Sequence, residues 1–192
     1  MRTISPELIR AYREAHYIVL DEGTEIRLQV GTVNLELARL MSSKNVRTAS
    51  VLTAYNPYSE VKTKQDNELA QMQLRQRLKE MGMATLDAIG RDAKEQWESE
   101  PSVLALDLTL KEAENLADEY GQNAFIWISK QDAVIELCLR YPSAEWLHTE
   151  LATLNHKLAH NLAINNLGIA TDGTIKHIVF TGRWSFGNFK EP

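Results

Sequence analysis

The hydrophobic positions in the first half of the chain follow strand spacing in some segments and helix spacing in others. An apolar run at residues 17–20, a turn at 21–23 and alternating apolar residues at 26–30 predict a β-hairpin with one buried face. A stripe at helical spacing predicts a long helix that opens with a capping box at Thr63 and ends at Gly82. The residues of this stripe are Ala70, Leu74, Leu78 and Met81.

The same alternation continues through residue 139. The apolar run 103–108 predicts a buried strand, and Thr109 opens a helix that ends at Gly121. Further helices are expected after the Ser5 cap and over residues 34–43, a weaker strand over 84–89, a polar segment over 90–102, and a second hairpin over 124–139. Hairpins interleaved with helices predict an α+β fold with a mixed, mostly antiparallel sheet packed against helices.

The pattern changes after Tyr141 and Pro142. Leucines at spacings of three and four predict a helix from Ser143 to Gly168: they are Leu147, Leu151, Leu154, Leu158 and Leu162. A turn at residues 172–173 then joins expected strands at 175–180 and 183–186. We therefore expect a core domain over residues 1–141 and a C-terminal helix and hairpin extension over 142–192, packed on the core.

Composition narrows the function classes. The 192 residues are 44% hydrophobic and 24% charged, with a net charge of -5 spread along the chain. This balance makes nucleic acid or an anionic membrane an unexpected partner, and no apolar run is long enough to span a bilayer. The polar N-terminal residues contain no signal core, and Cys138, in an apolar strand, has no cysteine to pair with. A cytoplasmic location is expected.

The best candidate for a site is the segment 53–59. The apolar run 49–52 ends there, Pro57 cannot continue a central strand, and Asn56 and Ser59 favour turns. A strand end facing a helix N-terminus favours an anion. The alternative is that these residues and Thr63 only close a turn and cap the helix, and the spacing alone favours it.

A resemblance to a known protein family adds to this interpretation. The chain resembles the domain-of-unknown-function 3293 family, a set of bacterial proteins without an assigned activity, over roughly residues 11–139. The matching positions, in order, are Tyr12, Tyr17, Thr53-Ala54, Asn56-Pro57, Ser59, Asn67, Leu74, Leu78, Gly82, Trp97, Glu100-Pro101-Ser102, the run 120–124 and Trp127. Ala70 stands where the family usually has a basic residue, which argues against an anion-binding role carried over from it.

The resemblance implies a pocket formed by residues 53–59, 97–102 and 121–123. Its expected ligand is a polar or nucleotide-like small molecule. The expected ligand-binding residues are Thr53, Asn56, Ser59, Asn67, Trp97, Ser102, Gln122 and Asn123. For residues 121–123, a helix C-cap is an equal alternative. Glu100 is a weak candidate for a general base, because a lone glutamate before proline more often lies solvated in a loop.

Most familiar chemistries are missing from the sequence. There is no Gly-rich phosphate loop, no cysteine pair and no Gly-x-Ser-x-Gly motif, so we expect no cofactor and cannot assign a reaction. His156 and His160 are four residues apart, but each lies about 200° round the helix from the leucine stripe. Lys157 also stands where a zinc protease motif has glutamate, so we expect no metal.

Two other functions stay open. The leucine stripe could serve an interaction or regulatory module, through a homodimer or protein partner at residues 143–167. A nucleic-acid accessory protein would use the basic and aromatic residues near the C-terminus, although ordinary strand faces explain them better. These residues are Lys176, His177, Arg183, Trp184 and Lys190. For the pocket, we expect Asn56→Ala to weaken ligand binding with little loss of stability, whereas unfolding would favour the turn-closing alternative.

Overall fold

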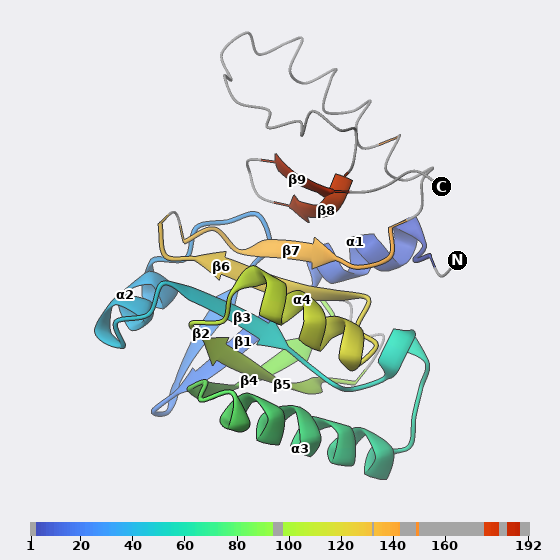
Figure 1. Ribbon diagram of the computed structural model, residues 1–192, viewed down its shortest axis with the longest axis horizontal. Coiled ribbons are helices and arrows are strands. Elements are labelled where there is room, and N and C mark those ends of the chain that lie inside the picture. Colours follow the sequence, from blue (N-terminus) through green and yellow to red (C-terminus); the bar gives the residue numbers. More distant parts are fainter. Residues whose placement is uncertain are drawn as a thin grey trace, which may run out of the picture.

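The computed structural model describes residues 3–93, 98–131, 133–142, 149, 175–180 and 184–188. The helices are α1 (Pro6–Glu14), α2 (Leu35–Ser43), α3 (Lys64–Glu80), α4 (Leu110–Glu119) and a short 3-10 helix, η1 (Pro57–Ser59). The strands are β1 (His16–Asp21), β2 (Thr24–Leu28), β3 (Thr48–Leu52), β4 (Thr85–Arg91), β5 (Glu100–Leu106), β6 (Ala124–Ser129), β7 (Glu136–Leu139), β8 (Ile175–Phe180) and β9 (Trp184–Asn188). Figure 1 shows their arrangement.

The strands form one curved sheet in the order β2-β1-β4-β5-β3-β6-β7-β8-β9. Every described pair of neighbouring strands is antiparallel, and an isolated parallel bridge joins Ile4 to Pro142. The predicted α+β fold is confirmed, including both hairpins of the core. Sequence neighbours are often separated in the sheet, since β3 lies between β5 and β6. The segment after β3 therefore emerges near the middle of the sheet.

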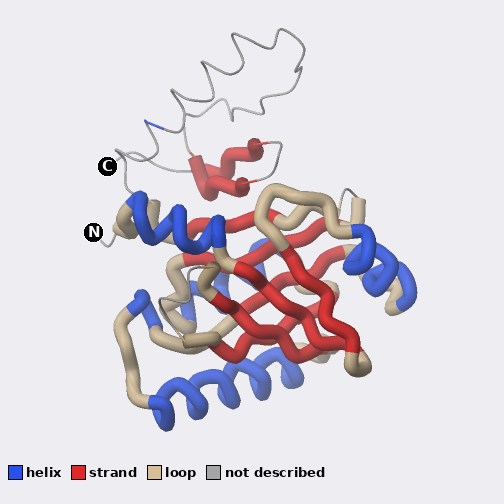
Figure 2. Tube along the Cα trace, turned by 180° about the vertical axis from the view of Figure 1, so that it is seen from behind, coloured by secondary structure: helices blue, strands red, loops and turns tan. Residues whose placement is uncertain are grey.

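Helices cover both faces of the sheet (Figures 1 and 2). On one face, α3 and α4 bury Leu74, Leu78 and Leu116 against alternate residues of β3, β5 and β6. On the other face, α1 and α2 bury Ile9 and Leu37 against the opposite set of strand residues. The alternation of side chains along each strand supplies both faces with apolar residues. Both faces of the sheet's centre are therefore apolar core.

Local signals fix the helix ends as the sequence predicted. The hydroxyls of Ser5, Thr63 and Thr109 each accept a hydrogen bond from a backbone N–H in the first turn. Gly82 and Gly121 follow α3 and α4 with φ of +75° and +63°, the left-handed conformation that ends many helices. The long helix and its two boundaries are therefore set mainly by residues within or next to it.

The polar segment expected over residues 90–102 is shorter than predicted. Gly90 pairs with Glu100 in the ladder between β4 and β5, so β4 continues to Arg91 and β5 begins at Glu100. Backbone pairing needs no apolar side chain, and therefore the ladder extends beyond the hydrophobic positions that mark each strand in the sequence. The prediction of a loop at residues 100–102 is wrong, and Glu100 lies in a strand.

The predicted C-terminal strands are present as β8 and β9, and β8 pairs with β7 beside the buried Cys138. Burial raises the pKa of the Cys138 thiol well above its usual value. The leucine helix at 143–168, the histidine pair and the turn at 172–173 lie outside the described residues. The division of the chain at residue 141 stays a prediction. In the part of the chain that the structure describes, no helix is both long and apolar enough to cross a bilayer.

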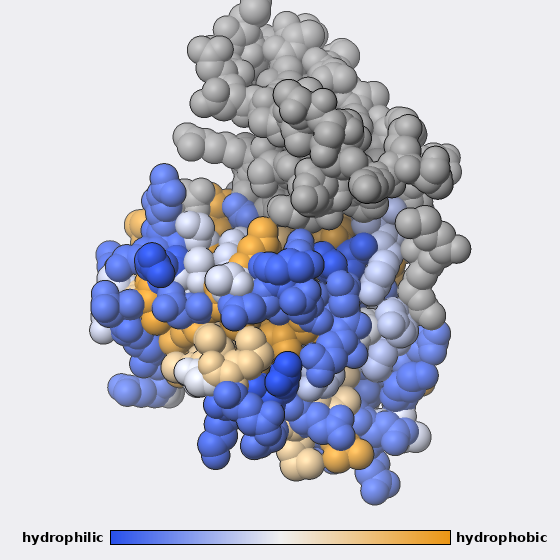
Figure 3. All heavy atoms as spheres, viewed as in Figure 1, coloured by the Kyte–Doolittle hydropathy of each residue, from blue (hydrophilic) through white to orange (hydrophobic). Residues whose placement is uncertain are grey.

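Hydrophilic side chains cover much of the face that carries α3 and α4, with apolar ones between them (Figure 3). On α3, Leu69 and Met72 are exposed apolar residues. Single exposed apolar residues are ordinary on a folded protein and need no function. The pocket described next lies elsewhere, on the face that α1 covers.

Candidate functional site

A pocket of about 220 Å³ lies where β3 ends and where β5 and β6 begin. Its floor is the α1-side face of the sheet, α1 contributes a wall with Leu8 and Tyr12, and the loop around η1 contributes another. The segment after β3 reaches this position because β3 runs between β5 and β6. The end of the apolar run 49–52, predicted from the sequence as the start of the candidate site, therefore lies at the pocket.

The register of three strands explains why a hollow exists there. Tyr17 of β1 pairs with Gly90 of β4, which pairs with Glu100 of β5. Paired residues lie on the same face of a sheet, so Tyr17 and Glu100 flank a position without a side chain. An added Cβ at Gly90 would meet no atom closer than 3.9 Å, the Oγ of Ser102. The gap left by Gly90 therefore forms part of the pocket.

Asn56 joins the loop, the long helix and the pocket. It adopts a left-handed conformation, with φ of 45°. Its N–H donates to Oδ1 of Asn67 (2.8 Å), and its own Oδ1 accepts from Nδ2 of Asn67 (2.9 Å) and from the N–H of Lys62 (3.0 Å). Its Nδ2 donates to Oε1 of Glu100 at 2.7 Å. Since Lys62 N–H is a donor, the orientation of the Asn56 amide is fixed by its partners.

Glu100 is a half-buried carboxylate that lines the pocket. Burial raises its pKa above the usual value, and the hydrogen bond from Asn56 lowers it by a smaller amount. Among the described residues, its Oε2 has no hydrogen-bond partner. The pocket thus contains a carboxylate oriented through one oxygen and available through the other.

A second polar group closes the α1 side of the pocket. Tyr12 Oη and Ser59 Oγ share a hydrogen bond of 2.7 Å, and Nδ2 of Asn123 donates to Ser59 Oγ (2.9 Å) and to Tyr12 Oη (3.3 Å). Burial raises the pKa of Tyr12, so its hydroxyl stays protonated. Oδ1 of Asn123 is buried without a partner among the described residues. This group ties α1 to η1 and to the start of β6.

The C-terminal end of α4 contacts η1 and the loop before it through hydrogen bonds. The N–H of Tyr58 donates to the C=O of Gly121 at 2.6 Å, and Nε2 of Gln122 donates to the C=O of Tyr55 at 3.0 Å. An added Cβ at Gly121 would lie 2.9 Å from the Tyr58 ring. Gly121 thus both ends the helix and permits η1 to approach it.

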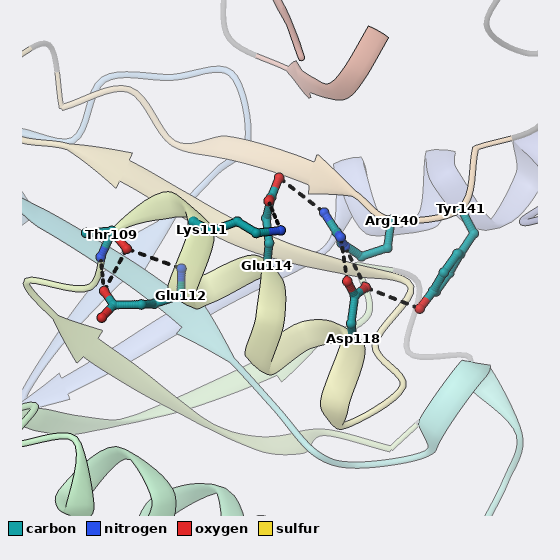
Figure 4. Close-up of polar contacts among 7 residues, drawn as sticks. All are labelled: Thr109, Lys111, Glu112, Glu114, Asp118, Arg140 and Tyr141. Carbon is teal, nitrogen blue, oxygen red and sulfur yellow. Dashed lines mark hydrogen bonds and ion pairs between the residues drawn. The ribbon is translucent and has the colours of Figure 1, made fainter. Parts of the chain in front are cut away.

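An ion-pair cluster braces the same end of α4 (Figure 4). Arg140 donates to both carboxylate oxygens of Asp118, at 2.8 and 2.6 Å, and lies 3.2 Å from Glu114. The Tyr141 hydroxyl donates to Asp118, and the Tyr141 ring centre lies 6.2 Å from that of Tyr58. The bidentate Arg140–Asp118 pair holds the chain after β7 against α4. Tyr141 then packs against η1 from outside the pocket.

The structure brings most of the predicted site residues together. Six of them, counting Glu100, line the pocket: Thr53, Asn56, Ser59, Glu100, Ser102 and Gln122. Asn67 and Asn123 support this lining through hydrogen bonds, and Trp97 lies outside the described residues. Whether these residues bind a ligand stays a prediction.

The sequence interpretation missed the α1 wall, Gly90 and Gln71. Gln71 is buried and accepts a hydrogen bond from the N–H of Ala54 at 2.8 Å. Its signal was present, since Asn67, Gln71, Leu74 and Leu78 follow one another at helical spacing and share a buried stripe. Tyr12 and Tyr17 belonged to the resemblance but had been assigned no role. Gly90 gave no local signal, because its place depends on strand register.

The anion site expected at the start of α3 gains no support. The Thr63 hydroxyl accepts from the N–H of Asp66, and the Asp66 carboxylate accepts from that hydroxyl at 2.6 Å. An acidic side chain therefore already lies at the positive end of the helix dipole. Among the described residues, no group of three or more histidine, cysteine or acidic side chains is placed to hold a metal.

Residues 52–125 match the model of a family described as a protein of unknown function, DUF3293. The centre of this chain carries the DUF3293 match. It runs from the end of β3 to the start of β6 and includes Asn56, Glu100 and Asn123, whereas α1 and β1 lie outside it. The resemblance is thus confirmed over part of the span expected for it.

No curated protein and no solved structure matches the chain. The DUF3293 match carries no reaction, so the pocket's chemistry has to be argued from its own residues. The interaction-module and nucleic-acid hypotheses stay predictions, because the side chains that motivate them lie outside the described residues.

Proposed function

We propose that the protein binds a polar small molecule in the pocket between α1, η1, the end of β3 and the start of β5. The observation that carries this proposal is the Glu100 carboxylate, held by Asn56 through one oxygen and available through the other. Binding pockets are typically apolar cavities with a few placed polar groups. Tyr17, Leu8 and Ala124 supply apolar surface around Glu100 here.

The strained loop supports the same proposal. Asn56, Tyr58 and Ser59 have φ of 45°, 61° and 60°, a conformation that side-chain-bearing residues rarely adopt. Each such residue costs on the order of 1–3 kcal/mol, which the rest of the fold must offset. Two of the three strained residues, Asn56 and Ser59, line the pocket. Glu22, Asn45, Asp107 and Ala133 also have positive φ away from the pocket, so the strain supports the proposal only through its place in the pocket lining.

The direct test is native mass spectrometry of freshly purified protein, followed by denaturation to release and identify a bound molecule. Gly90→Val is the variant that tests the pocket itself. Its added Cβ has room in the strand, and valine favours strands, so stability should be kept while its methyl groups occupy the cavity. We expect loss of the co-purified molecule.

Gly90→Ala is the matched control for this variant. It adds only the Cβ, at ordinary contact distance, and should retain most of the bound molecule. Retention of an identical bound mass by wild type and Gly90→Val would place any ligand elsewhere and contradict the proposal. The absence of any bound mass from all three proteins, repeated with metabolite extract added back, would contradict it as well.

A pH-dependent stability cost should accompany the pocket carboxylate. Because burial raises the folded-state pKa of Glu100 above its unfolded value, the folded protein binds more protons than the unfolded one between those values. Glu100 therefore makes the folded state less stable as pH rises through this window, which begins at the unfolded value near 4.5. Glu100→Gln should lack that decrease and be at least as stable as wild type at pH 7.

Urea denaturation at a series of pH values measures this effect as a difference between wild type and variant. Glu98→Gln, at an exposed position two residues earlier, controls for the loss of a carboxylate. A difference between wild type and Glu100→Gln that stays constant across the series would mean that burial of Glu100 has no energetic consequence.

A further inference from the structure

We propose that the pocket selects a ligand with a protonated nitrogen, an amidinium or amine, which binds Glu100 while its carbon body lies against tyrosine rings. This inference rests on the proposed function and specifies its ligand class. It follows from three properties of the lining: which hydrogen-bonding atoms are already used, where the charge lies, and which parts of the tyrosines face the cavity.

Most donors of the lining are already paired within the protein. The Thr53 hydroxyl donates to the C=O of Pro101 at 2.9 Å, and Ser102 donates to the C=O of Glu100 at 3.3 Å. The amide of Gln122 donates to two backbone carbonyls, those of Tyr55 and Tyr120. These groups can offer a ligand little donation without breaking an internal bond.

Two acceptor atoms of the lining are left over. Oε2 of Glu100 has no partner among the described residues, and the same holds for Oε1 of Gln122. The amide of Gln122 cannot be reversed, because both of its partners are carbonyl oxygens that require its nitrogen. A lining that offers acceptors and little donation favours a donor-rich ligand over an anion.

The charge in the pocket also favours a cationic ligand over an anion. No cation among the described residues lowers the pKa of Glu100, which burial raises. Burial raises the pKa values of Tyr12, Tyr17 and Tyr55, and the negative charge of Glu100 raises each of them further by a smaller amount. Arg91 also lines the pocket, but its side chain is exposed and donates to Ser99, so water screens its charge. The carboxylate is therefore the main charge inside.

The tyrosines present rings to the cavity more than hydroxyls. The Tyr17 hydroxyl donates to the C=O of Tyr12 at 3.0 Å, and the Tyr12 hydroxyl is shared with Ser59 and Asn123. With both hydroxyls engaged, Tyr12 and Tyr17 have mainly ring carbon left to offer a ligand, whereas the hydroxyl of Tyr55, which also lines the pocket, has no partner among the described residues. Aromatic rings beside a carboxylate attract a cation through both the ring faces and the charge.

These properties disfavour both an anion and a neutral ligand. A carboxylate or phosphate would be placed against Glu100 with only the exposed, water-screened Arg91 to compensate. A neutral amide could donate to Glu100, but a protonated nitrogen makes a charge-assisted bond, about twice as strong.

The test compares three probes of the same shape: benzamidine, benzamide and benzoate. Binding is measured by titrating each probe into ¹⁵N-labelled full-length protein at millimolar concentrations, following the backbone amides of Gly90, Glu100 and Gln122. We expect benzamidine to bind most tightly and benzoate not at all. Glu100→Gln should weaken benzamidine at least about tenfold, the amount expected for one charged hydrogen bond. Glu98→Gln should leave its affinity unchanged.

The outcomes separate this inference from the proposed function. If benzamide or benzoate binds as tightly as benzamidine and Gly90→Val abolishes that binding, the preference for a cationic ligand is overturned. The proposal that the pocket is a binding site would still hold. Unchanged benzamidine affinity in Glu100→Gln would overturn the role of Glu100. Failure of benzamidine to shift the pocket amides would also overturn the inference, and the co-purification test would then decide whether the pocket binds another class of molecule.

Discussion

Replacing Asn56 by alanine should destabilise the protein by about 2–4 kcal/mol, one of the two largest effects expected of a single substitution here. The change removes the side-chain bonds to Asn67, Lys62 and Glu100. It also puts alanine in a left-handed conformation that asparagine tolerates better. Urea denaturation gives the free energy of unfolding directly.

Asn56→Gly separates the two causes. Glycine adopts the left-handed conformation freely and, like alanine, loses the side-chain bonds. We expect Asn56→Gly to lie between wild type and Asn56→Ala, with the gap between the two variants measuring the backbone strain. A variant Asn56→Ala as stable as wild type would show that the loop does not depend on this side chain, contrary to its three hydrogen bonds.

This prediction revises the one drawn from the sequence, in which Asn56→Ala weakened binding with little loss of stability. The turn-closing alternative and the ligand-site hypothesis are not exclusive at this residue. Asn56 closes the turn with its N–H and Oδ1 and orients the pocket carboxylate with its Nδ2. A loss of binding in Asn56→Ala therefore cannot by itself identify a ligand contact, which is why Glu100 and Gly90 are better probes.

The fold was predictable where the signals are local. A cap such as Thr109, a stop such as Gly121 and an alternating strand depend on residues a few positions apart, and the chain keeps them in contact whatever the tertiary fold. The strand order is different, because nothing within residues 48–52 indicates that β3 lies between β5 and β6. That arrangement follows from the packing of the whole sheet.

The candidate site was predictable to the same extent. Asn56 and Ser59 were found because turn formers gather where an apolar run stops, and Asn123 was found through the family resemblance. Gly90 was not, since it matters only through its ladder partners Tyr17 and Glu100, on strands far apart in the sequence. Glu100 was misplaced for the same reason, because a polar residue before proline has no local sign of strand pairing.

Gly121→Ala should destabilise the protein by about 2–4 kcal/mol and loosen η1. Two costs add at this position. Alanine is strained at a φ of +63°, and its Cβ would lie 2.9 Å from the Tyr58 ring and 3.1 Å from Cβ of Pro57. The ring lies near both Gly121 and Tyr141, so the clash is relieved either by the ring turning away from Tyr141 or by η1 moving away from α4. Because η1 carries Ser59, ligand binding should weaken as well.

Gly82→Ala is the matched control, because Gly82 also ends a helix, has a φ of +75° and has no atom within 4 Å of an added Cβ. Gly82→Ala should lower the free energy of unfolding only by the strain of alanine at a positive φ, about 1–2 kcal/mol. The excess cost of Gly121→Ala should then disappear when the clash is removed, in the double variant Gly121→Ala with Tyr58→Ala compared with Tyr58→Ala alone. Equal costs for Gly121→Ala and Gly82→Ala would show that η1 has room beside α4. In that case the close approach of Tyr58 to Gly121 would not be what holds the pocket wall in place.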